Sequence, residues 1–454
     1  MARFSAAEFS AITGGCWSGT AVMPDSGLAI STDTRENNHG KIFFALSGER
    51  FDAHDFLAQA AASGCDALCI KREKSLLAPP GIPVLLVDDP LSAMQKCAAY
   101  HRKRFKDLTV FAVTGSVGKT SVKEMLYAVC AHAAGKDHTL CTIGNTNNQI
   151  GVAQNLLRLT GNHRYAVIEA GTSSPGEIAP LGAMIAADGA IVNSIAPCHL
   201  EKLIDLNGVA REKGCIYHAM PETATAVFPE ETAGKNILAD AAGKRNICPF
   251  GLNGKGKVHA RFISGNLEGS TFELHFPGGK SFTIHWHLTG IHNALNAAGA
   301  AALAFSCGID PEIIAAALPD TSLPGMRMKK SIISGVTYYN DAYNANPASM
   351  NASVDLLTST PLPRRLILLL GGMRELGEIS PAAHRQLLEY AEKKLPDAEI
   401  ITVGQEFDGI SKKHFTSLED AGKYLQSIIH SGDTVFAKGS RGNAVEKALP
   451  PEAR

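Results

Sequence analysis

Closely paired cysteines are missing from this sequence. Its ten cysteines are scattered singly from Cys16 to Cys307, no C-x-x-C occurs, and the nearest two are Cys65 and Cys69. Zinc sites and the disulfide frameworks of small secreted domains both depend on regular cysteine spacings. The sequence therefore predicts neither, and it fits a protein of the reducing cytoplasm.

An excess of one charge and long apolar runs are also absent. Lys and Arg number 43 against 44 Asp and Glu, for a formal net charge of -1. This balance argues against a nucleic-acid-binding surface and a polybasic membrane patch. No apolar run approaches the ~20 residues of a membrane helix, and the opening segment MARFSAAEFSAITGG lacks the apolar core of a signal peptide. We expect a cytoplasmic protein without nucleic-acid binding or membrane insertion.

Glycine and apolar residues are plentiful. The 454 residues include 43 glycines and are 45% hydrophobic, which is typical of an α/β enzyme with many turns. This length corresponds to about three domains. We expect them at residues 1–87, 88–321 and 322–454.

The order of apolar runs predicts an α/β fold throughout. The first part has strand-like runs at 41–46, 67–70 and 84–87, with a helix near 53–63. The second has strands at 108–113, 165–171, 189–195 and 225–229 between helical runs, which indicates a parallel sheet with crossover helices. Residues 258–288 alternate between polar and apolar, as in antiparallel hairpins, and a helix is expected at 293–307. The third part is a smaller α/β unit.

A glycine turn joins an apolar strand to a helix in LTVFAVTGSVGKT, residues 108–120. Such a turn directs backbone N–H groups and the positive end of the helix at one point, which suits a phosphate. Lys119 would reach the outer phosphates and the Thr120 hydroxyl would bind Mg²⁺. The loop has the short form T-G-x-x-G-K-T, because Val113 stands where the general pattern has glycine. The alternative is an ordinary strand-to-helix turn.

Two polar residues follow other strands of this predicted sheet. Glu169 ends one strand, where a carboxylate can hold Mg²⁺ directly or through water, and the alternative is a solvated carboxylate. His199 follows another strand, and the alternative is a packed or surface histidine. Lys213 lies in a helical run and, from the residues alone, is a solvated charge without a role.

Four further polar segments fall near strand ends or at a helix start, where ligands of parallel sheets bind. Residues 144–148 (GNTNN) offer side-chain amides, or form a plain loop. Asn293 and Asn296 begin a helix, where they suit an adenine edge, although Asn293 equally fits a helix cap. The others are DAYNANP at 341–347 and KGSR at 438–441.

Together these segments resemble the Mur ligase family, the ATP-dependent amide ligases of peptidoglycan precursor synthesis. The shared elements run in family order as TGSVGKTS, GNTNNQIG, the strand-end Glu169, CHLE with His199, Lys213 before Gly214, GIHNALNA, PGMRM and DAYNANP. Residues 31–56, DAYNANPASM and MRELGE at 373–378 are most similar to the branch that joins D-alanyl-D-alanine to UDP-N-acetylmuramoyl-tripeptide.

The resemblance implies a three-domain fold: an N-terminal uridine-substrate domain, a central P-loop ATPase-like parallel-sheet domain and a C-terminal Rossmann-like domain. It implies catalytic roles for Lys119, Lys213, His199 and Glu169. Metal ligands would be Thr120, Glu169, His199 and Lys213, the lysine as a carbamate. ATP would be bound by Gly115, Ser116, Val117, Gly118, Lys119, Thr120, Ser121, Asn293, Asn296, Arg327 and Asp341.

Substrate contacts are implied in all three domains. The uridine domain would use Ser31, Asp33, Arg35 and the stretch 45–51, and the central domain Asn145, Thr146 and Asn148. The third domain would use Tyr343, Asn344, Asn346, Lys438 and Arg441. The chain departs from the family at Gly372, where an Asp is frequent, at the Met before Arg327, and at Cys215, where an acidic residue is frequent.

The implied reaction is amide formation through an acyl phosphate, with ATP and Mg²⁺ as cofactors and the two named substrates as partners of a monomer. Three alternatives stay open. A folylpolyglutamate-synthase-like ligase shares the central fold, although residues 31–56 argue against it. A kinase or simple ATPase would use the same loop, and a non-catalytic binding protein would retain the fold without the reaction.

Overall fold

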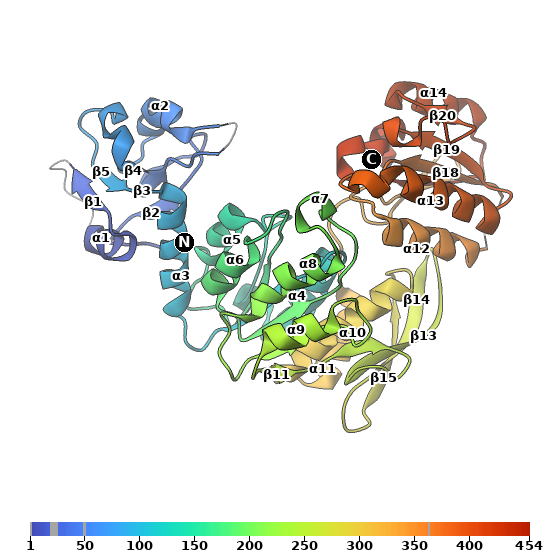
Figure 1. Ribbon diagram of the computed structural model, residues 1–454, viewed down its shortest axis with the longest axis horizontal. Helices are drawn as coiled ribbons and strands as arrows, with labels where there is room; N and C mark the ends of the chain where they lie inside the picture. The colour runs from blue at the N-terminus through green and yellow to red at the C-terminus, as the bar shows by residue number, and fades with distance from the viewer. Residues whose placement is uncertain (1, 19–25, 49–50, 362–363) are drawn as a thin grey trace.

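Three α/β regions follow one another along the chain (Figure 1). The computed structural model describes residues 2–18, 26–48, 51–361 and 364–454. The segment 45–51 that the resemblance assigned to the uridine domain lies partly outside them, at residues 49–50. No helix in these ranges has both the length and the apolar character that crossing a membrane requires.

The N-terminal region is a five-stranded sheet in the order β1-β5-β4-β3-β2. Four strands are parallel and β1 is antiparallel to β5. The strands predicted at 41–46, 67–70 and 84–87 are confirmed, and the helix near 53–63 divides into a 3₁₀ turn, Ala53–Phe56, and α2. The bounds are α1 Ala6–Thr13, β1 Cys16–Ser18, β2 Ala29–Ser31, β3 Lys41–Phe44, α2 Leu57–Ala62, β4 Ala67–Lys71 and β5 Val84–Val87.

The central region is built on a six-stranded parallel sheet, β11-β10-β9-β6-β8-β7. The central strand β6 is buried on both faces, as its continuous apolar run predicts. The strands are β6 Thr109–Thr114, β7 Thr139–Cys141, β8 Tyr165–Glu169, β9 Gly189–Val192, β10 Thr225–Val227 and β11 Asn246–Ile247. The helices are α3 Pro90–Lys103, α4 Lys119–Ala134, α5 Gln149–Leu156, α6 Ile178–Ile185, α7 Leu200–Leu203, α8 Leu206–Gly214, α9 Lys235–Ala242, α10 Ile291–Ser306 and α11 Pro311–Ala317.

A smaller four-stranded sheet completes the central region. Its strands are β12 Phe250–Leu252, β13 Val258–Asn266, β14 Gly269–His275 and β15 Ser281–Trp286. The antiparallel hairpins predicted at 258–288 are confirmed, and β12 adds a parallel strand beside β13. Phe272 and Trp286 of this sheet share a buried core with α4 and α10, which fixes the phosphate-loop helix against the sheet.

The third region is a six-stranded sheet, β16-β17-β21-β18-β19-β20, in which only β16 is antiparallel. Separate buried clusters lie against α12 and α13 and against α14, so helices cover both faces. The bounds are β16 Lys329–Ile333, β17 Val336–Asn340, α12 Pro347–Thr358, β18 Leu366–Gly371, α13 Ser380–Lys394, β19 Glu399–Val403, β20 His414–Phe415, α14 Leu418–Ile428 and β21 Thr434–Lys438.

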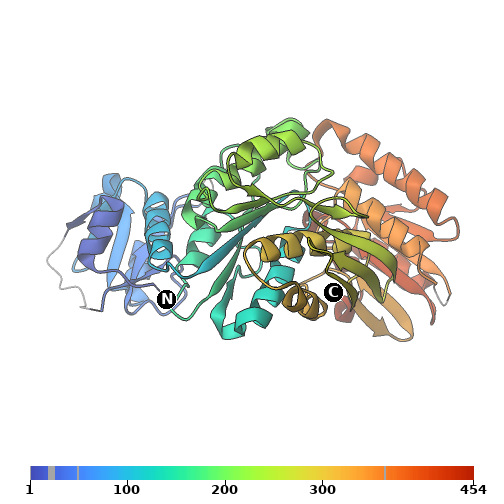
Figure 2. The same cartoon turned by 90° about the horizontal axis from the view of Figure 1, so that it is seen from below.

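The tip of the β13–β14 hairpin joins the central and third regions. Leu267 is buried within the core of the third region, and its N–H donates to Thr360 Oγ1 at 3.2 Å. Glu268 accepts from Tyr339 and pairs with Lys330. Two perpendicular views place the hairpins beside the third region (Figure 1, Figure 2).

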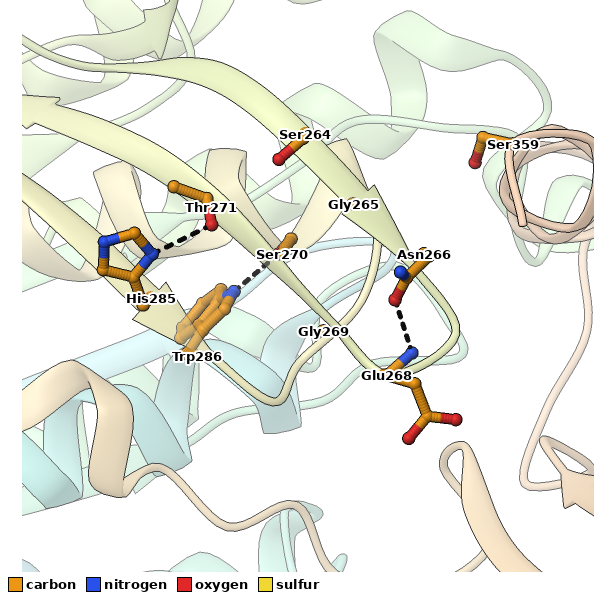
Figure 3. A pocket seen from close by; sticks show the side chains of 10 residues that line it. All are labelled: Ser264, Gly265, Asn266, Glu268, Gly269, Ser270, Thr271, His285, Trp286 and Ser359. Atoms are coloured by element: carbon orange, nitrogen blue, oxygen red, sulfur yellow. Dashed lines mark hydrogen bonds between the residues drawn. The ribbon is translucent and has the colours of Figure 1, made fainter. Parts of the chain in front are cut away.

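A cavity of about 370 Å³ lies at this junction, with Ser359 across from the hairpin tip (Figure 3). None of its lining residues belongs to the predicted site. The cavity therefore marks the seam between the two regions rather than the place of the chemistry.

Candidate active site

The loop between β6 and α4 needs glycine at two positions, because there is no room for a side chain at either. Gly118 has φ +81°, and a Cβ there would lie 2.5 Å from Asn193 Nδ2. Gly115 has φ +153°, and its Cβ would lie 3.0 Å from the Ser194 nitrogen. Larger residues would push the loop away from the end of β9. The first N–H groups of α4 lack acceptors within the helix and remain for a phosphate.

Lys119 begins α4 and folds back over its own loop. Its Nζ donates to Gly115 O at 2.8 Å and to Ser116 O at 3.4 Å. Two backbone carbonyls of the loop therefore hold the ammonium, while the N–H groups of Ser116 and Val117 donate to Ser194. A phosphate bound there would offer the lysine a stronger, charge-assisted partner.

Glu169 is the centre of a buried oxygen cluster at the end of β8. Its Oε2 accepts from Thr120 Oγ1 at 3.1 Å and its Oε1 accepts from Asn147 Nδ2 at 2.7 Å. Glu169 is 1% exposed. The structure thus brings together Thr120 and Glu169, two of the four residues predicted to hold metal, and the alternative of a solvated strand-end carboxylate is wrong.

His199 follows β9 at the same edge of the central sheet. It adopts the left-handed conformation, with φ 52°, and its Nδ1 lies 3.0 Å from Glu375 Oε2 of the third region. The histidine bond is the largest cause that lowers the pKa of Glu375, and Lys119 and Lys202 lower it further. His199 is therefore held by an ionised carboxylate.

Lys213 is 1% exposed, so its interpretation as a solvated charge is wrong. Burial, with Lys119 nearby, lowers its pKa to about 7. A buried amine that is partly neutral near pH 7 is a nucleophile rather than a surface cation.

Asn293 and Asn296 belong to a chain of side-chain amides behind the phosphate loop. Asn193 donates to Val117 O at 2.9 Å and to Asn296 Oδ1 at 3.0 Å. Asn296 donates to Asn293 Oδ1 at 3.3 Å, and Asn293 donates to Thr289 O. The N-cap of α10 is Gly290, so the helix-cap interpretation of Asn293 is wrong.

The predicted third-region residues contact one another. The Arg327 guanidinium lies over the Tyr343 ring, 3.6 Å from its centroid. Lys438 pairs with Asp341, and Arg441 lies 3.4 Å from Glu446. Asn346 caps α12, while Asn344 Oδ1 accepts from the Ala345 N–H. These side chains already have protein partners.

Among the predicted substrate residues of the other two regions, Ser31 is buried at the end of β2, and the others lie in the loops that follow β2 and β7. Arg35 and Asp33 form a bidentate pair that lowers the pKa of Asp33 to about 2. Thr32, between Ser31 and Asp33, accepts from Gln154 of α5 at 3.0 Å, which brings this turn to the central region.

Residues 144–148 form a turn that leads into α5, and their side chains make different hydrogen bonds. Thr146 Oγ1 accepts from buried Asn155, and Asn148 caps α5. Asn145 is exposed, and no hydrogen bond of its side chain to the rest of the described chain is found.

Two residues of the site, Asn193 and Glu375, were not predicted from the sequence, and Asn147 was predicted only as one amide of the segment 144–148. Asn147 and Asn193 are amides that look like their neighbours, and only the fold separates them. Glu375 stands in MRELGE, a motif to which no residue role was attached.

At Gly372, an added Cβ would collide with the Glu406 carboxylate, so that carboxylate fills the space where the family frequently carries Asp.

The comparisons extend over most of the chain. Residues 113–304 match the Mur ligase middle domain and residues 326–441 match the Mur ligase glutamate ligase domain. The chain is 36% identical over 433 residues to the UDP-N-acetylmuramoyl-tripeptide–D-alanyl-D-alanine ligase of Escherichia coli K12, covering 93% of this chain and 92% of that protein.

Solved structures give the same result. The fold matches a crystal structure of MurF from Acinetobacter baumannii with a TM-score of 0.89 and 31% identity, over 99% of this chain and 98% of that one. It matches MurF ligase of Thermotoga maritima in complex with ADP with a TM-score of 0.79 and 25% identity, over 93% and 96%. The expected three-domain fold is confirmed, and the chain belongs to the Mur ligase family.

Proposed function

We propose that this protein joins D-alanyl-D-alanine to UDP-N-acetylmuramoyl-tripeptide and converts ATP to ADP and phosphate. The observation that carries the proposal is the cluster at the carboxyl edge of the central sheet: a phosphate loop, the Thr120–Glu169 pair, and Lys213 buried with a lowered pKa. Its relatives in the family bear the name of this reaction.

The division of labour that we propose follows the three regions. Residues 1–87 bind the uridine nucleotide through Ser31, Asp33 and Arg35. Residues 88–321 bind ATP and the muramoyl peptide, and residues 322–454 bring the incoming amine. All ten cysteines are free thiols, which supports our inference of a cytoplasmic enzyme. We further propose that it acts as a monomer.

The residues present fit a magnesium ion. Thr120 and Glu169 offer oxygens 3.1 Å apart, and hard cations such as Mg²⁺ prefer oxygen ligands. Among the described residues no three His, Cys, Asp or Glu side chains gather as a metal cage. Mg²⁺ characteristically takes few protein ligands and completes its shell with water and substrate phosphates. Thr120 and Glu169 would hold one Mg²⁺ and His199 would help to hold a second, and bound Mg²⁺ supplies charge neutralisation at the transferring phosphoryl group.

The protein contributes to the reaction by positioning the substrates and by neutralising the charge on the transferring group. One oxygen of the tripeptide carboxylate attacks the γ-phosphorus of ATP, and ADP leaves. Lys119 neutralises charge on the transferring group. The amine of D-alanyl-D-alanine then attacks the acyl carbon, and the tetrahedral intermediate expels phosphate. Apposition of the third region excludes water, which would otherwise hydrolyse the acyl phosphate.

We also propose that Lys213 is carbamylated. Carbon dioxide reacts with a neutral amine, and burial of Lys213 lowers its pKa to about 7. The product is an anion that suits the surroundings of Lys119 and of a metal. The family resemblance assigns a carbamate to Lys213, and the burial of the side chain supports that assignment. The sequence around Lys213 alone had predicted a solvated charge.

An omission assay tests the function. Phosphate release is measured with ATP, D-alanyl-D-alanine and the tripeptide nucleotide, and then with each left out. We expect release only with all three, together with a pentapeptide nucleotide detected by mass spectrometry. Equal ATP turnover without either co-substrate would instead indicate a simple ATPase, and a phosphorylated product without amide formation would indicate a kinase.

A further inference from the structure

One ion pair links the phosphate edge of the central region to the third region. His199 Nδ1 and Glu375 Oε2 lie 3.0 Å apart, and the imidazole is more buried than the carboxylate, at 26% and 62% side-chain exposure. Neighbouring residues are close as well, because a Cβ added at Gly377 would lie 3.4 Å from Glu201 Cγ. The segments 199–201 and 375–377 therefore face each other.

Both partners have an uncommon backbone. His199 has φ 52° and Glu375 has φ 64°, in the left-handed region that non-glycine residues seldom adopt. Strained backbone persists only where the surroundings enforce it, and it gathers at functional sites. Here it turns both side chains toward one contact between regions that are far apart in the chain.

We propose that Glu375 is a positioning residue that orients His199 for metal binding, so that the third region completes the metal site of the central one. This inference rests on the proposed function for the place of the metal.

The chemistry follows from which nitrogen carries the proton. An ionised carboxylate can only accept, so Nδ1 of His199 must donate to Glu375. In the neutral ring the lone pair then lies on Nε2, on the opposite side of the imidazole. Metal-binding histidines are commonly held in this way by a carboxylate on the other nitrogen, which fixes both the tautomer and the ring orientation.

The origin of Glu375 gives this contact a second consequence. Thr120, Glu169 and His199 all belong to the central region, whereas Glu375 comes with the third region. The histidine is thus oriented only when the two regions are apposed as they are here. Metal affinity should therefore depend on the same apposition of the two regions that brings the amine to the acyl phosphate.

The test is a Mn²⁺ titration followed by electron paramagnetic resonance, with an ATP analogue whose β–γ bridge is nitrogen. The full-length variants are Glu375→Ala, Glu375→Gln, His199→Ala and the double alanine variant. Glu389→Gln is the control, because Glu389 is exposed on α13 and has no ion pair among the described residues.

We expect Glu375→Ala to weaken Mn²⁺ binding about tenfold. Glu375→Gln should weaken it less, because the amide oxygen still accepts from Nδ1. The double variant should bind Mn²⁺ no more weakly than His199→Ala alone, since Glu375 acts through the histidine. Additive losses in the double variant, or unchanged Mn²⁺ affinity in Glu375→Ala, would overturn the proposal.

Two further readouts separate the alternatives. A contact that merely joins the regions would lower the melting temperature of Glu375→Ala and leave Mn²⁺ affinity at the wild-type value, which also contradicts the proposal. The titration needs no ligation. If wild-type protein fails the omission assay while the Mn²⁺ results are as expected, the proposed reaction is wrong and the role of Glu375 stands.

Discussion

The central and third regions prepare their sides of the site differently. In the central region, Thr120 and Asn147 both donate to Glu169, and Asn193 and Asn296 fix the loop around Gly118. In the third region the charged residues pair with one another, as Lys438 does with Asp341 and Arg441 with Glu446.

This difference separates a preassembled site from one that must exchange partners. The central side chains already converge on the place that we propose for a phosphate and a cation. Third-region side chains such as Arg327, stacked on Tyr343, have to leave a protein partner to reach a ligand. Substitutions in the central region should therefore affect the chemical step, and those in the third region should affect substrate binding.

The largest effect is expected for Lys119→Ala. Loss of the cation at the transferring phosphoryl group should lower kcat about 1,000-fold. The fold should persist, because among the described residues Lys119 Nζ donates only to carbonyls of its own loop. Steady-state kinetics and thermal melting check both statements, with Lys136→Ala, an exposed lysine near the end of α4, as the control. A wild-type kcat in Lys119→Ala would show that the loop takes no part in the reaction.

Lys213→Ala should lower kcat about 100-fold through loss of the carbamate near the metal. Short carboxylates such as acetate should restore part of the activity, while the exposed Lys244→Ala variant should behave as wild type. Unaltered activity in Lys213→Ala would contradict this role.

The same lysine predicts a pH dependence. Because the pKa of Lys213 is about 7, the fraction of its amine that is neutral increases as pH rises through 7. At a fixed concentration of dissolved CO₂, reactivation of decarbamylated enzyme should therefore quicken as pH rises through this interval and slow below it. Activity that needs no bicarbonate at any pH would argue against the carbamate.

A smaller effect is expected for Arg327→Lys in the third region. The substitution keeps the charge but loses the planar stacking on Tyr343, which is about 0.5–1 kcal/mol at an exposed site. KM for ATP should change a few-fold with kcat nearly constant, and Arg385→Lys on the exposed face of α13 is the control. A large fall in kcat at unchanged KM would mean that the third region takes part in the chemical step as directly as the central one.

The sequence predicted those parts of the molecule that depend on local pattern. Strand β6 is a continuous apolar run because both of its faces are buried, and the glycines after it mark a tight turn. The alternation in β13 to β15 reflects a sheet with one covered face. Glu169 was found because it ends a strand of the same sheet, where ligands are expected.

What the sequence could not predict depends on contacts between distant residues. Lys213 lies in a polar helical run, and only the packing around α8 shows that it is buried. Asn145, Asn147 and Asn148 are chemically alike, yet Asn147 alone contacts Glu169. The bond between His199 and Glu375 joins two regions, so no local pattern reveals it.

The central claim is that the γ-phosphoryl group of ATP passes to the tripeptide carboxylate. The most direct test uses tripeptide nucleotide with ¹⁸O at both oxygens of that carboxylate and follows the released phosphate by mass spectrometry. Attack by the carboxylate, followed by displacement by the amine, leaves one carboxylate oxygen in the phosphate, so we predict one ¹⁸O per phosphate released. Phosphate without ¹⁸O, formed alongside the amide product, would contradict the acyl phosphate.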